Sequence, residues 1–246
     1  MFKKILMIGM SLAITTGALA ETVETSSEKD KAERIKAFAQ SINIDYEQKK
    51  DSPFLFDEKD TTNYEVLYFF SYSCPHCYEF KDYKNEWLNQ KKDDVAFHSI
   101  PVSFQDNWEI TAKGHIIADQ LKLNNFEKTI YDRINRKGYK INKMDDLRDL
   151  MSEEYSIDSS VFNSLYNSLE TEIKLEKYTK ITDDLEVMGT PSIVVITKDN
   201  KVFLTSPSIA KGSGNTIFST EFLMMRDRKQ QEGKKNYGIS TFVSSA

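Results

Sequence analysis

A nearly unbroken apolar run from Val66 to Tyr72 is the clearest element signal in the sequence. Such a run predicts a central β-strand that other elements cover on both faces. Helical periodicity follows directly, and one apolar stripe carries Cys77, Phe80, Tyr83, Trp87 and Leu88. A second strand is predicted from Val95 to Val102, where Pro101 indicates a strand end or a position at the sheet edge.

The middle of the chain, from Phe104 to Glu186, has helical periodicity and almost no β-branched runs. We expect several helices here, with breaks near Asn124-Asn125, Lys137-Gly138 and Ser156 to Ser160. The last long helix is predicted from about Thr171 to Val187, with Gly189 as its C-cap.

Strand signals return after this helical block. The runs Ser192 to Thr197 and Val202 to Leu204 flank the turn-forming pair Asp199-Asn200, which predicts a β-hairpin. A final helix is predicted from about Ser219 to Gln231, ahead of a basic tail. The predicted order is therefore strand, helix, strand, helical block, hairpin and helix.

The first twenty residues have the pattern of a secretory signal peptide. Lys3 and Lys4 precede a short apolar core and the A-x-A sequence Ala18-Leu19-Ala20, so we expect residues 1–20 to be removed and the mature protein to begin at Glu21. A membrane-spanning helix is disfavoured, because about 16 uncharged residues fall short of the roughly 20 that are needed. These features indicate a bacterial periplasmic protein with no membrane span in the mature chain.

Removal of the signal leaves an acidic chain with a charged N-terminal stretch. The full sequence has 33 basic and 38 acidic residues, so loss of two lysines gives a net charge of 31 − 38 = −7. This acidity argues against nucleic acid or an anionic membrane as the main partner. Residues 21–45 have apolar positions at helical spacing, and we expect either a solvated helix or one that docks on the core or on a second subunit.

Cys74-Pro75-His76-Cys77 contains the only two cysteines of the chain and lies at the predicted strand-to-helix junction. A lone C-x-x-C in this position indicates a thiol–disulfide redox centre. A disulfide that closes so short a loop adds little stability, which disfavours a purely structural role. Cys77 lies on the apolar stripe and should point toward the core, whereas Cys74 precedes the first turn and should be exposed.

Three features predict a low pKa for Cys74. The N-terminus of a helix favours an anion, Pro75 suits the first helical position, and His76 can donate a hydrogen bond or carry a positive charge. Each unit of pKa below ambient pH stabilises the reduced form by about 1.4 kcal/mol. For a two-electron couple this raises the potential by about 30 mV, so we expect an oxidising disulfide.

Two further features bear on this site. A zinc site that uses the two cysteines with His98 or His115 is the main alternative, but neither histidine has a partner at ligand spacing. Thr190-Pro191 opens a predicted strand, where a proline is sterically permitted. Together with the upstream C-x-x-C, we expect a cis peptide bond there.

The stretch from Phe69 to Tyr78 resembles the active-site segment of the DsbA family of periplasmic thiol:disulfide oxidoreductases. The helical block resembles the helical insertion of that family at Asp145 to Asp149 and Val161 to Leu165. Thr190-Pro191 falls where the family has its cis-proline. The resemblance extends from about Tyr46 to about Arg228.

This resemblance implies an α/β thioredoxin fold with an inserted all-helical domain. Residues 46–102 and 188–246 would form the thioredoxin-like domain and residues 103–187 the helical insertion. The signal peptide at 1–20 and a charged extension at 21–45 would precede them. The resemblance also implies that the protein works without a cofactor or a metal. We expect it to be a monomer.

The resemblance further implies that the protein donates the Cys74–Cys77 disulfide to newly translocated proteins. Cys74 would be the exposed nucleophile and Cys77 the buried resolving residue, while Pro75 and His76 tune the potential. Re-oxidation would come from a DsbB-like membrane partner that passes electrons to quinone.

Substrate backbone would bind at Thr190 and Pro191. DsbA proteins commonly have valine where this chain has Thr190, and threonine is typical of isomerase relatives. Tyr68 also replaces the buried glutamate of the enteric proteins. A disulfide isomerase or reductase therefore remains an alternative, as does a periplasmic metal-binding module that uses Cys74, Cys77 and a histidine.

Overall fold

A five-stranded mixed β-sheet forms the centre of the structure, a computed structural model that describes residues 46–56 and 62–243. The strand order is β1-β5-β4-β2-β3. The strands are β1 (Glu47–Lys49), β2 (Tyr64–Phe70), β3 (Val95–Pro101), β4 (Ser192–Thr197) and β5 (Val202–Thr205). β2 is parallel to β3 and antiparallel to β4. The predicted signal peptide and the extension at 21–45 lie outside the described residues.

All seven residues of β2 are buried, which explains the apolar run in the sequence. Alternate side chains enter two separate hydrophobic clusters: Val66 and Tyr68 belong to one, and Leu67 and Phe69 belong to the other. Because both faces of the strand are covered, nearly all of its side chains are apolar. Glu65 is the charged exception, and its buried carboxylate accepts hydrogen bonds from the backbone N–H groups of Leu55 and Phe56. The prediction of a central, doubly covered strand is confirmed.

The strands on either side of β2 have weaker sequence patterns than β2 itself. β3 lies at the sheet edge and ends at Pro101, as its sequence predicted. The hairpin of β4 and β5 is also confirmed, and Asn200 takes a left-handed conformation in its turn (φ 68°). β1 was not predicted, because its three polar residues have no apolar pattern and are placed by antiparallel pairing with β5.

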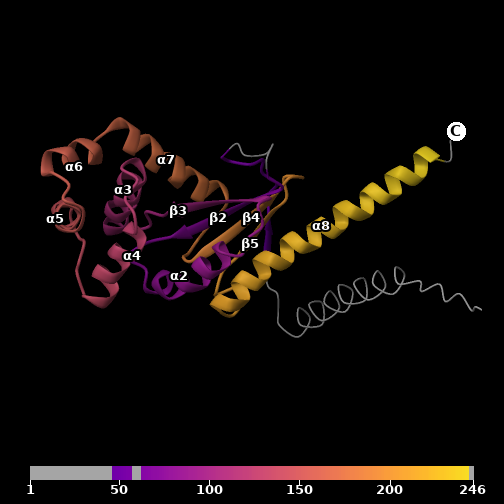
Figure 1. The fold of residues 1–246 in the computed structure, drawn as a ribbon, viewed down its shortest axis with the longest axis horizontal. Helices are drawn as coiled ribbons and strands as arrows, with labels where there is room; N and C mark the ends of the chain where they lie inside the picture. The colour runs from indigo at the N-terminus through magenta and orange to yellow at the C-terminus, as the bar shows by residue number, and fades with distance from the viewer. Residues whose placement is uncertain (1–45, 57–61, 244–246) are drawn as a thin grey trace, which may run out of the picture. The chain divides into compact units, whose positions relative to one another are not determined.

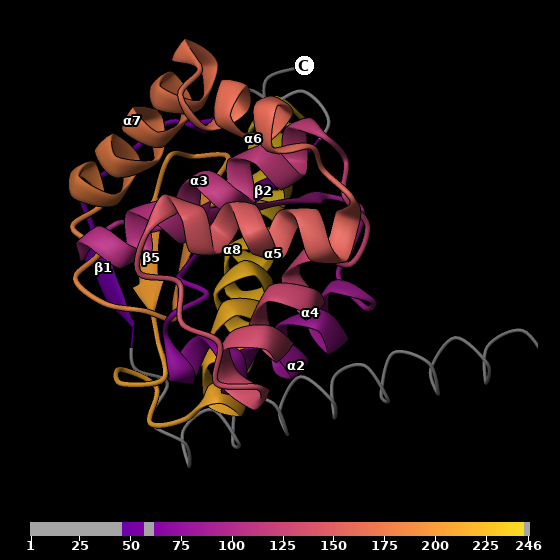
Figure 2. The ribbon, with the colours of Figure 1, turned by 90° about the vertical axis from the view of Figure 1, so that its left-hand side faces the viewer.

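Helices cover both faces of the sheet (Figure 1). α2 (Pro75–Leu88) and α8 (Ser213–Val243) pack on one face, and α7 (Leu169–Asp184) packs on the other together with α3 (Asp106–Gln120). Between α3 and α7 the chain forms α4 (Phe126–Tyr131), a π-helical turn η1 (Asp132–Arg136), α5 (Met144–Tyr155) and α6 (Ser159–Tyr166). α3 lies at the centre of this helical block and contacts α4, α5, α6 and α7 (Figure 2).

Three predicted details are wrong. α7 ends at Asp184 rather than Val187, and Gly189 is not its C-cap. The chain instead turns at Glu186, which adopts φ 52°, while its N–H donates to Asp183 O and the N–H of Val187 donates to Thr182 O. These two bonds form a Schellman motif, which here uses a glutamate in place of the usual glycine.

The other two corrections concern α8 and α2. α8 begins six residues before the predicted Ser219, and it packs against β4 and α2. It also continues through Gly233, although glycine is a weak helix former. On α2, Tyr83 is 48% exposed, whereas Lys84 is buried. Within the described part of the chain, none of the helices combines the length and apolar character needed to cross a membrane.

Candidate active site

Cys74 occupies the N-cap position of α2, directly after β2, and Pro75 takes the first helical position. The prediction that Cys74 is exposed is wrong: only 5% of its surface is accessible. The segment that leads into β4 lies against it, and the Cys74 thiol donates a hydrogen bond to the carbonyl of Thr190 over 3.6 Å. The Thr190–Pro191 peptide bond is cis. Both cysteines are free thiols in this structure.

The surroundings of Cys74 lower its pKa to about 5. The hydrogen bond from the Cys77 side chain is the largest cause, followed among the favourable ones by the Thr190 side chain and by the backbone N–H groups of Cys77 and His76. Burial opposes the shift, because desolvation disfavours the charged form. Cys74 is therefore a thiolate at neutral pH.

Cys77 has the opposite environment. It is fully buried on the sheet-facing side of α2, and burial raises its pKa well above the ordinary range. The neighbouring Cys74 acts in the same direction. Cys77 is therefore a neutral thiol at neutral pH, and the two sulfurs are chemically distinct although both belong to one turn of helix.

The two residues between the cysteines are exposed. The His76 side chain is directed at Glu79, with its Nδ1 3.3 Å from a carboxylate oxygen, and is 77% exposed. His76 lowers the pKa of Cys74 through its backbone N–H, whereas the sequence predicted a contribution from its imidazole ring. The dipeptide thus acts mainly by starting the helix.

A groove of about 520 Å³ opens beside the site. His76, Thr190 and Pro191 line it on the side of the cysteines, and the loop that follows β5 lines it elsewhere. Met188, at 90% exposure, stands at this groove. An exposed methionine in this groove offers an adaptable apolar contact.

Comparisons with known proteins agree with this geometry. No family model matches the sequence. The thiol:disulfide interchange protein DsbA of Azotobacter vinelandii is 26% identical over 168 residues, which cover 68% of this chain and 76% of that protein. DsbA of Pseudomonas syringae is 26% identical over 172 residues, with 70% and 78% covered. The crystal structure of DsbA from Xylella fastidiosa superposes with a TM-score of 0.65 at 26% identity, and covers 75% of this chain and 96% of that one.

The chain is a thiol:disulfide oxidoreductase that is similar to DsbA. Its fold is the thioredoxin fold with a helical insertion, as in DsbA structures. The crystal structure of Pseudomonas aeruginosa DsbA, at 22% identity and a TM-score of 0.67, supports this fold over 76% of the chain.

The histidines considered as metal ligands lie elsewhere in this DsbA-type fold. His98 stacks on Phe56, and His115 pairs through Nδ1 with the Tyr72 hydroxyl at 2.9 Å. Burial lowers the pKa of His115. Among the described residues, histidine, cysteine, aspartate and glutamate form no group of three that is arranged to hold a metal.

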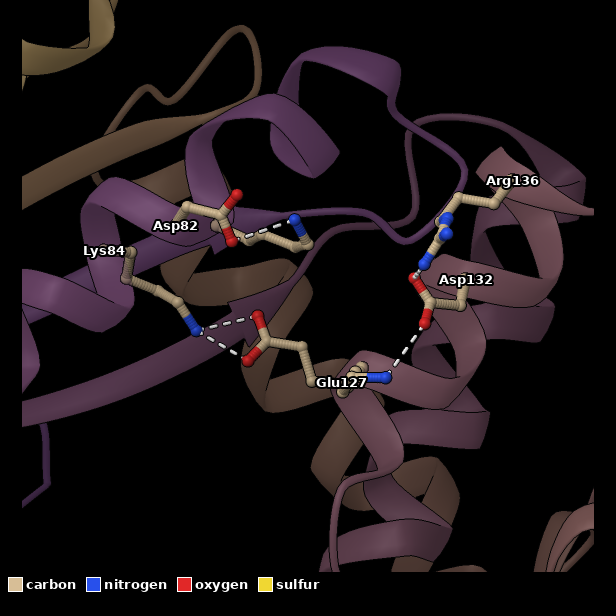
Figure 3. A network of polar contacts seen from close by, with 7 residues as sticks. Asp82, Lys84, Glu127, Asp132 and Arg136 are labelled. Carbon is tan, nitrogen blue, oxygen red and sulfur yellow. Dashed lines mark hydrogen bonds and ion pairs between the residues drawn. The ribbon is translucent and has the colours of Figure 1, made fainter.

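Sequence reasoning missed a buried polar cluster on the inner side of Cys77. Lys84 of α2 is almost fully buried, and its Nζ donates to both carboxylate oxygens of Glu127 at 2.7 Å (Figure 3). Tyr68 and Tyr131 are also fully buried in this region, and their hydroxyls have no hydrogen-bond partner. The position of Lys84, seven residues after Cys77 on one helix, was the available signal, because two helical turns place both on the same face. Glu127 and Tyr131 belong to a distant segment and gave none.

Proposed function

We propose that this protein is a periplasmic dithiol oxidase that donates its Cys74–Cys77 disulfide to folding secreted proteins. The observation that carries the proposal is the opposite direction of the two cysteine pKa shifts, with Cys74 lowered to about 5 and Cys77 raised. A stable Cys74 thiolate favours the reduced form of the enzyme, and so favours transfer of the disulfide to another protein.

In the proposed mechanism, a substrate thiolate attacks the Cys74 sulfur of the oxidised enzyme. A mixed disulfide forms, and the bonding electron pair of the Cys74–Cys77 disulfide remains on Cys77. A second substrate thiolate then attacks the substrate's own sulfur and expels Cys74, which leaves readily because its thiolate is stable. Of the two protons that the substrate loses, one ends on Cys77 and the other in solvent.

Thr190 and Pro191 are the proposed contacts for substrate backbone. They line the groove beside Cys74, together with the exposed Met188. An extended, unfolded substrate segment suits an open groove better than a folded surface does. A DsbB-like membrane protein that passes electrons to quinone is the proposed source of re-oxidation.

A disulfide isomerase was the alternative suggested by Thr190. In this structure the Thr190 side chain helps to lower the Cys74 pKa, which favours an oxidant over an isomerase. We therefore retain the oxidase as the proposed function, acting as a monomer and without a cofactor.

The proposed domain organisation follows the sequence analysis. Residues 1–20 are the signal peptide and residues 21–45 a charged extension. Residues 46–102 and 188–246 form the thioredoxin-like domain, and residues 103–187 form the helical one. The positions of the described elements support this proposal. All five strands fall within 46–102 and 188–246, and α3 to α7 fall within 103–187.

The test is to trap the mixed disulfide. In Cys77→Ser the resolving thiol is absent, so Cys74 should remain linked to secreted proteins when the variant is expressed with its signal peptide. These adducts should disappear on reduction in gel electrophoresis. Cys74→Ser, the matched control, should form none and should be inactive in oxidising a dithiol peptide. Absence of adducts in both variants would refute the assigned roles.

A further inference from the structure

The leaving sulfur of the proposed reaction is buried, which raises the question of what stabilises it. When a substrate attacks Cys74, Cys77 leaves as a thiolate, yet none of its surface is accessible to water. A buried anion without hydrogen-bond donors is costly. Hydrogen bonds from the backbone of Ser71 and the side chain of Thr190 favour this thiolate. The Thr190 side chain also stabilises the Cys74 thiolate, and the net effect of burial is still to raise the Cys77 pKa.

Tyr68 lies on the sheet directly under this part of α2. Phe80 follows Cys77 by three residues and so shares its face of the helix, and the Phe80 ring stacks on the Tyr68 ring with centroids 5.7 Å apart. Lys84 continues the same stripe, with its Nζ 5.6 Å from the centre of the Tyr68 ring. Cys77, Phe80 and Tyr68 are all members of one hydrophobic cluster.

The Tyr68 hydroxyl is available for a new hydrogen bond. It is fully buried and has no partner that satisfies hydrogen-bond geometry. Burial raises its pKa most, and the charges of Cys77 and Glu127 add to this. The side chains of Tyr131 and Cys77 lie close enough to the Tyr68 hydroxyl to influence its pKa. Neither of them meets the full geometry of a hydrogen bond with it. Tyr68 therefore stays protonated and can act as a donor.

We propose that the Tyr68 hydroxyl donates a hydrogen bond to the Cys77 sulfur as that sulfur leaves the disulfide. Because no existing bond must break, the donor is already in place when charge develops. Tyr68 keeps its proton throughout, and Cys77 later takes up the substrate-derived proton described above. Tyr68 would thus be a catalytic residue of the inner side of the site. This inference rests on the proposed thiol exchange.

The test compares Tyr68→Phe with the wild-type full chain in two reactions. The first is reduction of the oxidised protein by glutathione, in which Cys77 must leave. The second is alkylation of the reduced protein by iodoacetamide, which reports only the Cys74 thiolate. We expect the first rate to fall about 10-fold or more, as for loss of a hydrogen bond to a charged group, and the second rate to stay unchanged.

Tyr64→Phe is the matched control, because Tyr64 is a buried tyrosine on the same face of the same strand. Its hydroxyl bonds to Met224 O and to Asp227, both at 3.1 Å. This variant should lose stability without slowing reduction. Equal reduction rates for Tyr68→Phe and wild type would overturn the inference, as would equal slowing of reduction and alkylation. Failure of the wild-type protein to exchange with glutathione at all would instead overturn the proposed function.

Discussion

Cys74 and Cys77 lie three residues apart, yet their pKa values are shifted in opposite directions. Their local environments account for the difference. Cys74 receives hydrogen bonds from Cys77, from Thr190 and from two backbone N–H groups, which lower its pKa to about 5. Cys77 is buried more deeply, and burial raises its pKa. The same residue type therefore supplies a stable leaving group at one position and a neutral thiol at the other.

Thr190 should be a measurable contributor to this asymmetry. Its hydroxyl is buried and has no partner while Cys74 is protonated, so it is free to donate to the thiolate. We predict that Thr190→Val raises the Cys74 pKa above 5 and lowers the reduction potential by about 30 mV per pKa unit. Ultraviolet absorbance of the thiolate against pH measures the pKa. Thr190→Ser, which keeps the hydroxyl, should remain near wild type, and an unchanged pKa in the valine variant would contradict this role.

At the scale of elements, the helix that carries the cysteines is joined to the helical insertion by one buried ion pair. Lys84 on α2 is 3% exposed and donates to both oxygens of Glu127 on α4 (Figure 3). A charge in such a position is tolerated because its partner is present. The pair therefore fixes the active-site helix against a segment more than forty residues away in sequence.

Removal of one partner should destabilise the fold. We predict that Glu127→Gln lowers the free energy of unfolding by about 2–3 kcal/mol, because it leaves the Lys84 ammonium buried without a counter-charge. This is less than the cost of about 3–5 kcal/mol for breaking a fully buried pair, because the Glu127 side chain is 32% exposed. Denaturant unfolding of the reduced protein measures it.

An exposed pair of similar length is the control for this prediction. Lys180 and Asp184 on α7 also lie 2.7 Å apart, but both side chains are mostly accessible to solvent. Asp184→Asn should change stability by less than about 0.5 kcal/mol. Equal effects of the two substitutions would contradict a special contribution from the buried pair.

The elements that the sequence predicts well are those with a strong local pattern. The β2 strand and the β4–β5 hairpin follow from apolar runs and a turn signal, and the helical block follows from periodicity. β1 has no such pattern, and its pairing with β5 connects residues far apart in the chain. The ends of α7 and α8 also differ from the sequence prediction. α7 ends in a Schellman motif that uses Glu186 in place of a glycine, and α8 is longer than its pattern indicated.

The candidate site shows the same division. The positions of Cys74, Cys77 and Pro191 follow from motifs. The burial of Cys74 does not, because it depends on Thr190, which is 116 residues away. The buried cluster of Tyr68, Tyr131 and the ion pair is likewise produced by contacts between β2, α2 and α4, which periodicity alone cannot reveal.

At the scale of the whole molecule, the acidity of Cys74 links folding stability to redox state. In the unfolded chain a cysteine has a pKa of about 8.5, whereas folded Cys74 has a pKa of about 5. Between these values the unfolded reduced protein binds a proton at Cys74 that the folded protein does not. The reduced protein should therefore gain stability as pH rises, and the oxidised protein, which has no thiols, should not share this gain.

We predict that the free energy of unfolding of the reduced protein, relative to the oxidised protein, rises between about pH 5 and about pH 8.5, by up to about 1.4 kcal/mol per unit. Below pH 5 this contribution is lost. Above about pH 8.5 the raised pKa of Cys77 acts in the opposite sense, because only the unfolded thiol then ionises. Denaturant unfolding of both redox forms across this range measures the difference, and reduced Cys74→Ser should lack the rise. Parallel pH profiles for the two wild-type forms would contradict it.

The reduction potential of the Cys74–Cys77 pair tests the central claim most directly. Purified protein would be equilibrated with glutathione buffers of graded composition, and the fraction oxidised would be determined at each. We predict a value near about −120 mV, which is typical of strongly oxidising DsbA enzymes. A value of about −200 mV or lower would contradict a disulfide donor, and would mean that the Cys74 thiolate is not stabilised enough to drive transfer to substrates.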